Sequence, residues 1–139
     1  MKVLIIDDEK SICELVTLVL ELEGHSVTTS HTMQKGYDIF LDDMFDLVLL
    51  DLRIGNNYGL DLLPKLLDRR PYQIVSIITA NISIEHSENA IALGAYDFIS
   101  KPFGRDQLLT LMVKVKRELK RIEVLQNLTS KIHKLSAKI

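Results

Sequence analysis

The chain has one cysteine, Cys13, among its 139 residues, and it has no long apolar run. A single cysteine can form neither an intrachain disulfide nor a cysteine-based metal site, which favours a cytoplasmic protein. The amino-terminal apolar run, Val3–Ile6, stops at an acidic pair. This run is too short for a signal peptide or a membrane span, so nothing in the sequence directs the chain to a membrane.

Several ligand-binding motifs are also missing. A phosphate loop rich in glycine, serine and threonine does not follow the first apolar run, which argues against a flavin site there. No Walker motif and no helix-turn-helix pattern occurs, so we expect any ATPase or DNA-binding activity to reside outside these residues. The histidines lack metal-ligand spacing and receive no role: His25, His31, His86 and His133.

Composition and charge are those of one globular domain. Apolar residues make up 47% of the chain and charged residues 26%, and a chain of this length can bury a sizeable core. The net charge of -2 conceals an asymmetry, because residues 1–103 contain 8 Lys+Arg and 16 Asp+Glu, whereas residues 104–139 contain 9 and 3. A basic end is typical of nucleic-acid binding or of a solvated helix face, and we favour the solvated face.

Short β-rich runs alternate with segments of helical periodicity. The predicted strands are Val3–Ile6, Ser26–Ser30, Asp46–Leu50, Ile74–Thr79 and Tyr96–Ser100. The predicted helices lie at 12–20, 33–41, 60–67 and 84–93, and a fifth starts near residue 108. Ser11 and Glu14 have the spacing of a capping box at the start of the first helix. Three strands are almost continuously apolar, as in a sheet that is covered on both faces.

This order of elements predicts an α/β fold. Strict alternation of strand and helix gives a doubly wound, five-stranded parallel sheet with right-handed crossovers. For a flavodoxin-like fold of this kind the strand order is 2-1-3-4-5, and ligands bind beyond the carboxyl ends of the strands, where the order reverses. Functional residues are therefore expected at that edge.

Polar residues follow or end four of the predicted strands: Asp7, Asp8, Asp51, Thr79 and Lys101. Taken singly, each has a simpler interpretation, as a helix cap, a turn residue, a strand end or a solvated lysine. Gathered at one edge, they favour a functional site. Three neighbouring carboxylates repel one another unless a cation neutralises them, and Mg²⁺ prefers such oxygen ligands.

These residue types suit phosphoryl transfer. The carboxylate of Asp51 can attack phosphorus and form an acyl phosphate. Lys101 and Thr79 offer an ammonium group and a hydroxyl group to the phosphoryl oxygens. The sequence therefore predicts a metal-assisted phosphoacceptor site on Asp51.

Over residues 1–120 the sequence resembles the bacterial response-regulator receiver domain. The matching segments are VLIIDDEKSI, LVLLDL, the run Gly59-Leu60-Asp61, IITA and GAYDFISKPF. The resemblance implies a switch of a two-component system that catalyses only its own phosphorylation and dephosphorylation. A sensor histidine kinase is then the phosphoryl donor and Mg²⁺ the cofactor. The GAYDF and KPF segments are most similar to receivers of enhancer-binding, nitrogen-regulator type transcription activators, so transcription is the expected output.

The resemblance also implies roles for individual residues around the metal. Asp8 is expected to be a direct ligand, Asp7 to hold metal-bound water, and Asp51 to contribute a carboxylate oxygen. The main-chain carbonyl of Arg53 is expected to be a further ligand.

A second set of implied roles concerns switching. Lys101 is expected to pair with the phosphoryl group, and the Lys101-Pro102 peptide bond to be cis. Thr79 and Phe98 are the implied switch pair, which changes the face formed by the fourth helix, fifth strand and fifth helix. Ordinary core packing is the simpler interpretation of Phe98.

An apolar stripe continues beyond the predicted domain. Its last members recur at steps of three and four residues, as in a coiled-coil seam: Leu125, Leu128, Ile132, Leu135 and Ile139. We therefore divide the chain into a receiver domain, 1–120, and a helical extension, 121–139. The extension either forms a homodimer or leads to an output domain outside this sequence. A homodimer through the fourth-helix and fifth-helix face is the other arrangement that we consider.

Three other functions are kept as alternatives. A metal-dependent phosphohydrolase with an aspartyl intermediate has a DxD motif after the first strand, whereas here Asp7 and Asp8 are adjacent. A flavin-binding domain of the same topology needs the missing phosphate loop and would be coloured. A phosphorylation-independent scaffold that dimerises through the last helix would not need a complete acceptor site.

Overall fold

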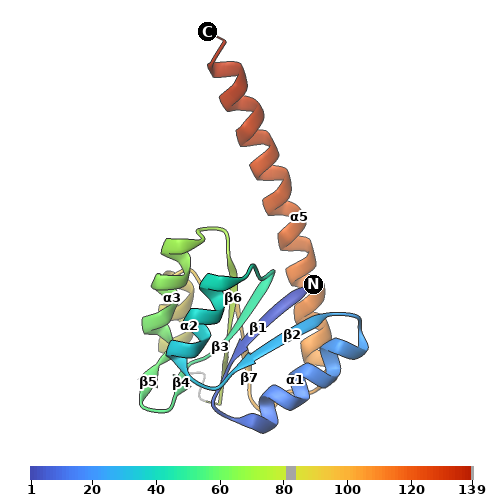
Figure 1. The fold of residues 1–139 in the computed structure, drawn as a ribbon, viewed down its shortest axis with the longest axis vertical. Helices are drawn as coiled ribbons and strands as arrows, with labels where there is room; N and C mark the ends of the chain where they lie inside the picture. Colours follow the sequence, from blue (N-terminus) through green and yellow to red (C-terminus); the bar gives the residue numbers. More distant parts are fainter. Residues whose placement is uncertain (81–83, 139) are drawn as a thin grey trace.

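A computed structural model describes residues 1–80 and 84–138 of the chain (Figure 1). In this part of the chain, five parallel strands form one sheet in the order β2-β1-β3-β6-β7. The strands are β1 (Lys2–Ile6), β2 (Ser26–Ser30), β3 (Leu47–Asp51), β6 (Ile74–Thr79) and β7 (Asp97–Ser100). When only the five strands of this sheet are numbered along the chain, the order is the predicted 2-1-3-4-5, which confirms the fold class.

Helices cover both faces of the sheet (Figure 1). They are α1 (Lys10–Leu22), α2 (Met33–Asp42), α3 (Gly59–Arg69), α4 (Ile84–Ala92) and α5 (Arg105–Ser136). The helices α1 and α5 pack on one face, and α2, α3 and α4 pack on the other. The predicted helices are all present, with ends that differ by a few residues.

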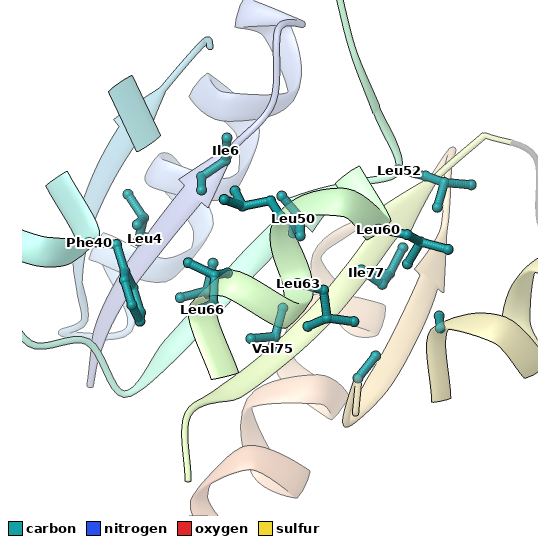
Figure 2. Packing of buried hydrophobic residues seen from close by; sticks show 14 of the residues in the cluster. Leu4, Ile6, Phe40, Leu50, Leu52, Leu60, Leu63, Leu66, Val75 and Ile77 are labelled. Carbon is teal, nitrogen blue, oxygen red and sulfur yellow. The ribbon is translucent and has the colours of Figure 1, made fainter. Parts of the chain in front are cut away.

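The strands supply side chains to both faces in alternation, because successive residues of a strand point to opposite sides. On β1, Val3 and Ile5 join the cluster under α1 and α5, whereas Leu4 and Ile6 join the cluster under α2 and α3. Figure 2 shows the second cluster, in which Phe40 lies over β1. All residues of the central strand β3 are buried, which explains its nearly continuous apolar sequence.

The start of α1 differs from the prediction. The helix begins at Lys10 with Glu9 as its N-cap, so Ser11 lies inside it and the predicted capping box with Glu14 is wrong. The reason is local: the Glu9 main-chain oxygen accepts hydrogen bonds from Ile12 and Cys13, and these bonds start the helix earlier. A side-chain cap is present on α2 instead, where the Thr32 hydroxyl accepts from the Lys35 amide.

A small antiparallel hairpin, which the sequence did not predict, follows β3. It consists of β4 (Arg53–Ile54) and β5 (Asn57–Tyr58). Gly55 forms its turn with a φ of 59°, a backbone conformation that favours glycine. The hairpin places main-chain groups beside the carboxyl edge of the sheet.

The helix α5 is continuous from Arg105 to Ser136 and projects well beyond the sheet (Figure 1). Its first third packs on the core through Leu108, Leu111, Met112 and Val115. Among the described residues, no helix is long and apolar enough to cross a membrane. Two features of the sequence, Ile139 at the end of the apolar stripe and the side chain of His86, lie outside the described part of the chain.

Candidate functional site

The five predicted site residues meet at the carboxyl edge of the sheet. Asp7 and Asp8 follow β1, Asp51 ends β3, Thr79 ends β6 and Lys101 follows β7. Because β1 and β3 are neighbours, the acidic residues beyond them come together, and their carboxylate oxygens lie within 4.8 Å of one another. Asp8, Asp51, Thr79 and Lys101 line one cavity of about 270 Å³.

Lys101 supplies a positive charge to this acidic cluster. Its Nζ lies 2.9 Å from Asp7 Oδ2, 3.0 Å from Glu9 Oε1 and 3.3 Å from Asp51 Oδ2. The side chain of Lys101 is 8% exposed, so solvent screens the pairs with Asp7 and Asp51 only weakly. One ammonium group therefore pairs with three carboxylates. The carboxylate of Asp8 lies close to those of Asp7 and Asp51.

This charge imbalance shifts the pKa values of Asp51 and Lys101. Burial raises the pKa of the Asp51 carboxyl to about 6, and the charge of Asp7 adds to the effect, while Lys101 opposes it. Burial alone would lower the pKa of Lys101, but its contacts with Asp7 and Glu9 and the charge of Asp51 raise that pKa above its ordinary value. The cluster thus carries more negative charge than Lys101 neutralises.

Main-chain hydrogen bonds hold the two aspartates that follow β1. The Asp7 amide donates to the Ser30 oxygen on the neighbouring strand at 2.9 Å, and Asp7 Oδ1 accepts from the Glu9 amide at 2.9 Å. Asp8 Oδ2 accepts from the Gly55 amide at 2.8 Å. The Asp8 carboxylate therefore ties the end of β1 to the hairpin that follows Asp51.

The loop that follows Asp51 brings Gly59 back against the main chain of Asp51 and Leu52. The Gly59 amide donates to the Leu52 oxygen at 2.6 Å. A Cβ atom on Gly59 would lie 2.1 Å from the Asp51 main-chain oxygen and 3.2 Å from the Leu52 Cα. No side chain fits at this distance, so the start of α3 can pack against the end of β3 only with glycine at this position.

Thr79 and Phe98 lie on the same face of the sheet. In the parallel pairing of β6 and β7, Ile77 is opposite Phe98 and Thr79 is two residues further along, and alternate residues of a strand share a face. Both Ile77 and Phe98 belong to the cluster under α2, α3 and α4. Thr79 is buried, whereas Phe98 is half-buried at the edge of that cluster.

The segment after β7 brings Lys101 into the site. The Lys101 amide donates to the Thr79 oxygen at 2.8 Å, and the Lys101-Pro102 peptide bond is cis. Lys101 thereby lies opposite the ends of β1 and β3.

The donor set of the acidic cluster fits a small, hard divalent cation. Carboxylate oxygens are the ligands that Mg²⁺ prefers, and a cation among them would relieve the repulsion that raises the pKa of Asp51. The cavity also reaches Arg53 and Gly55 of the hairpin. The fit therefore rests on the chemistry and proximity of the oxygen atoms.

Sequence reasoning assigned no role to two residues of this site. Glu9 forms an ion pair with Lys101, and its only signal in the sequence is its position directly after the acidic pair. Gly59 stands out in the sequence only through its spacing from Asp51, and its close approach to the Asp51 oxygen emerges only from the fold. Cys13 is a buried core residue, and burial, with the charge of Asp7, raises the pKa of its thiol to about 11.

Comparison with known proteins agrees with this geometry. Residues 3–113 match the response regulator receiver domain family. The chain is 37% identical over 107 residues to the alginate biosynthesis transcriptional regulatory protein AlgB of Pseudomonas putida, covering 77% of this chain and 24% of that protein. It is 34% identical over 124 residues to a putative NtrX-like response regulator of Rickettsia bellii, covering 84% and 26%. The chain thus spans about a quarter of the length of these relatives.

Solved structures show the same fold. NtrX from Brucella abortus superposes with a TM-score of 0.83 at 32% identity, covering 88% of this chain and 29% of that one. A CheY-like receiver domain protein from Methanospirillum hungatei superposes with a TM-score of 0.81 at 29% identity, covering 86% and 97%. The family match covers most of the chain, and the acidic pocket lies at the edge where this fold binds ligands. The chain therefore belongs to the response regulator receiver domain family, and it is a signalling switch rather than an enzyme.

Proposed function

We propose that this domain is a cytoplasmic phosphoacceptor that receives a phosphoryl group on Asp51 from a sensor histidine kinase, with Mg²⁺ as cofactor. The observation that carries this proposal is the meeting of three carboxylates within 4.8 Å with an ammonium group 3.3 Å from Asp51 Oδ2. A carboxylate nucleophile, a cation site and a charge partner for the phosphate are all within one cavity.

Asp51 is the proposed nucleophile. One of its carboxylate oxygens forms the new bond to phosphorus as the bond between phosphorus and the donor histidine nitrogen breaks, and that nitrogen takes up a proton. The side chain of Asp51 is 7% exposed, yet it opens onto the cavity. The donor can thus approach the Asp51 carboxylate from the cavity.

The proposed metal ligands are Asp7, acting through water, Asp8, Asp51 and the main-chain carbonyl of Arg53. When bound, Mg²⁺ supplies positive charge to the phosphoryl oxygens and offsets their repulsion by the carboxylates. Asp8 and Arg53 are held on the same side of the pocket by the bond from the Gly55 amide to Asp8.

Lys101 and Thr79 are the proposed partners of the phosphoryl oxygens. Lys101 already lies beside the Asp51 carboxylate, so its ammonium group needs only a small displacement to pair with a phosphoryl oxygen. Thr79 lines the cavity and can bring its hydroxyl to a second oxygen.

A movement of Thr79 toward the phosphate would change the space available to Phe98. Both side chains lie on one face of the sheet, and Phe98 is only half-buried, so it can turn inward. We propose that this change alters the surface of α4, β7 and α5. Phosphorylation shifts the equilibrium only as far as phosphate is bound more tightly by one state than by the other.

The proposed output is transcription, through residues outside this sequence. The AlgB relatives are named as transcriptional regulatory proteins, and the matched segment is about a quarter of their length. Residues 1–120 would then form the receiver, and residues 121–139 the helical connection to the output. The continuity of α5 across residue 120 supports a mechanical link between these two parts.

The decisive experiment is incubation with acetyl phosphate and Mg²⁺, followed by intact-mass analysis. We expect a mass increase of one phosphoryl group that Asp51→Asn abolishes and that a metal chelator suppresses. Asp61→Asn is the matched control, because Asp61 is an exposed aspartate on α3 outside the pocket, and it should be labelled like the unmodified chain.

Two results would contradict the proposal. Labelling of Asp51→Asn to the same extent would place the phosphoryl group elsewhere. No labelling with acetyl phosphate or with any histidine kinase would favour the phosphorylation-independent scaffold, and sustained turnover of a phosphomonoester would favour the phosphohydrolase.

A further inference from the structure

Tyr58 contributes an aromatic side chain to the cavity that contains Asp51. Among the described residues that line this cavity, the others carry charges, a hydroxyl group, or small and aliphatic side chains, so Tyr58 supplies the only ring. Tyr58 is half-buried, and its side chain also packs against the core cluster under α2, α3 and α4. The ring therefore lies between the core and the cavity.

The main chain around Tyr58 is tied to the site on both sides. Tyr58 belongs to β5 of the hairpin, which Figure 1 shows at the same end of the sheet as the carboxyl ends of the strands. At the turn of the hairpin, the Gly55 amide donates to Asp8 Oδ2 at 2.8 Å. Directly after Tyr58, the Gly59 amide donates to the Leu52 oxygen at 2.6 Å. These two bonds hold the backbone of Tyr58 beside the cavity.

Tyr58 also stands at a helix start that a tyrosine serves poorly. It is the N-cap residue of α3, and its side chain makes no capping hydrogen bond. Serine, threonine, aspartate and asparagine are preferred at this position, because their short side chains accept a bond from the first amides of the helix. Departures from such a local rule are expected at functional or strained sites. The cavity therefore explains this tyrosine better than the helix does.

The proposed donor brings a second ring to this cavity. In an in-line transfer, the donor nitrogen lies on the far side of phosphorus from the attacking Asp51 oxygen. Asp51 is buried, whereas Tyr58 is half-buried and Arg53 is exposed. The imidazole ring of the donor must therefore occupy the outer part of the cavity, which these two hairpin residues line.

A phenol ring suits an imidazole neighbour. Aromatic rings attract one another in offset-stacked or edge-to-face pairs, and one such pair is worth about 2- to 10-fold in binding beyond the area that it buries. Phosphodonors without a ring, such as phosphoramidate and acetyl phosphate, cannot form this pair. Tyr58 thus provides a contact that depends on the chemical class of the donor.

We infer that Tyr58 is a specificity-determining residue, which packs against the imidazole ring of the donor and so favours phosphorylated histidine over phosphodonors that lack a ring. The inference rests on the proposed phosphoacceptor function of Asp51. With N-phosphoimidazole as the donor, the Asp51 oxygen forms its bond to phosphorus and the P–N bond breaks. The departing nitrogen keeps the electron pair and takes up a proton from solvent. Tyr58 holds the ring and takes no part in these bond changes.

Two small donors with the same kind of P–N bond test the inference. The 139-residue chain is incubated with Mg²⁺ and either N-phosphoimidazole or phosphoramidate, and labelling is followed by intact mass. The readout is the rate constant with N-phosphoimidazole divided by that with phosphoramidate, because a general loss of activity cancels in this ratio.

Tyr58→Leu keeps an apolar side chain against the core and removes the ring. It should lower the ratio about 2- to 10-fold, whereas Tyr58→Phe keeps the ring and should keep the ratio. Tyr72→Leu is the matched control, because Tyr72 is 57% exposed and does not line this cavity; its rates with both donors should equal those of the unmodified chain.

A second variant without the ring separates recognition of the donor from folding. Tyr58→Ser supplies a preferred N-cap residue but no apolar contact with the core, so its effect on stability differs from that of Tyr58→Leu. Equal reductions of the ratio in the two variants would assign the effect to the lost ring.

An unchanged ratio in both variants, or an equal loss of rate with the two donors, would overturn the inference and leave Tyr58 as a packing residue. A failure of the proposed function looks different, because neither donor would then label Asp51 in the unmodified chain. That result would overturn the phosphoacceptor function and this inference together.

Discussion

The Cα of Gly59 lies so close to Asp51 that a Cβ atom there would stand 2.1 Å from the Asp51 main-chain oxygen. The first turn of α3 is thereby packed directly on the end of β3. We expect Gly59→Ala to lower the free energy of unfolding by about 1–3 kcal/mol, because the backbone must move apart to admit the methyl group. Since the same movement displaces Asp51, phosphorylation by acetyl phosphate should slow about 10-fold or more.

Urea unfolding and intact-mass kinetics measure these two effects. Gly104→Ala is the matched control, because a Cβ there would meet its nearest neighbour, the Gln107 side chain, at 3.5 Å, which is an ordinary contact. If Gly59→Ala left the free energy of unfolding and the phosphorylation rate unchanged, the close approach of Gly59 to Asp51 would not constrain the site.

The raised pKa of Asp51 predicts a pH-dependent effect on stability in the absence of metal. The folded protein holds the Asp51 proton up to about pH 6, whereas the unfolded chain releases it near 3.8. Because the folded state binds more protons in that interval, its stability falls as the pH rises from about 4 to 6, and the loss persists at neutral pH. Asp51→Asn should therefore be more stable than the unmodified chain at pH 7, by on the order of 1–3 kcal/mol.

Urea unfolding in the presence of a chelator at pH 4, 5, 6 and 7 checks this prediction. The stability difference should shrink toward pH 4, where Asp51 is protonated in the folded state. Asp68→Asn removes an exposed carboxylate from α3 and should change the stability by less than about 0.5 kcal/mol at each pH. A destabilised Asp51→Asn at neutral pH would contradict the assigned repulsion.

Mg²⁺ should stabilise the folded domain. A ligand at ten times its dissociation constant raises the free energy of unfolding by about 1.4 kcal/mol, which corresponds to several degrees in melting temperature. Asp8→Asn should reduce this response, because it removes a proposed ligand, whereas Asp61→Asn should retain it. Thermal melts at matched ionic strength provide the measurement, and an equal response in Asp8→Asn would exclude Asp8 as a ligand.

Glu9 is expected to slow phosphorylation. Its carboxylate lies 3.0 Å from Lys101 Nζ, so it competes with phosphoryl oxygens for the ammonium group and also repels an incoming anion. Glu9 is exposed, which limits the effect to less than about 1 kcal/mol. Glu9→Gln should accordingly increase the rate with acetyl phosphate about 2- to 5-fold. Glu14 is an exposed carboxylate on α1, the helix that follows Glu9, and Glu14→Gln should show no increase. A slower Glu9→Gln would reverse the assigned role.

The sheet, and the meeting of polar residues at its carboxyl edge, can be predicted from local sequence. Strands such as Leu47–Asp51 are buried on both sides, so they are nearly continuous apolar runs whose short length distinguishes them from helices. Once strand and helix alternate, topology brings the residues after β1 and β3 together. The sequence alone therefore predicts that Asp7, Asp8 and Asp51 share one site.

Other features depend on contacts between distant residues and leave no local signal. The ion pair of Glu9 with Lys101 joins residues 92 positions apart. The bond from the Gly55 amide to Asp8 joins residues 47 positions apart, and it involves a main-chain donor that any residue type except proline provides. The early start of α1 was missed because the first helical hydrogen bonds are made by the main chain of Glu9, whereas the prediction relied on side-chain caps.

The unbroken course of α5 has a mechanical consequence. The helix packs against the core as far as Ile122 and extends about 20 Å further to Ser136. A tilt of about 10° at its root would move the far end by about 4 Å. Under the proposed switch, a small repacking beside β7 would therefore be converted into a larger displacement at the tip of this helix.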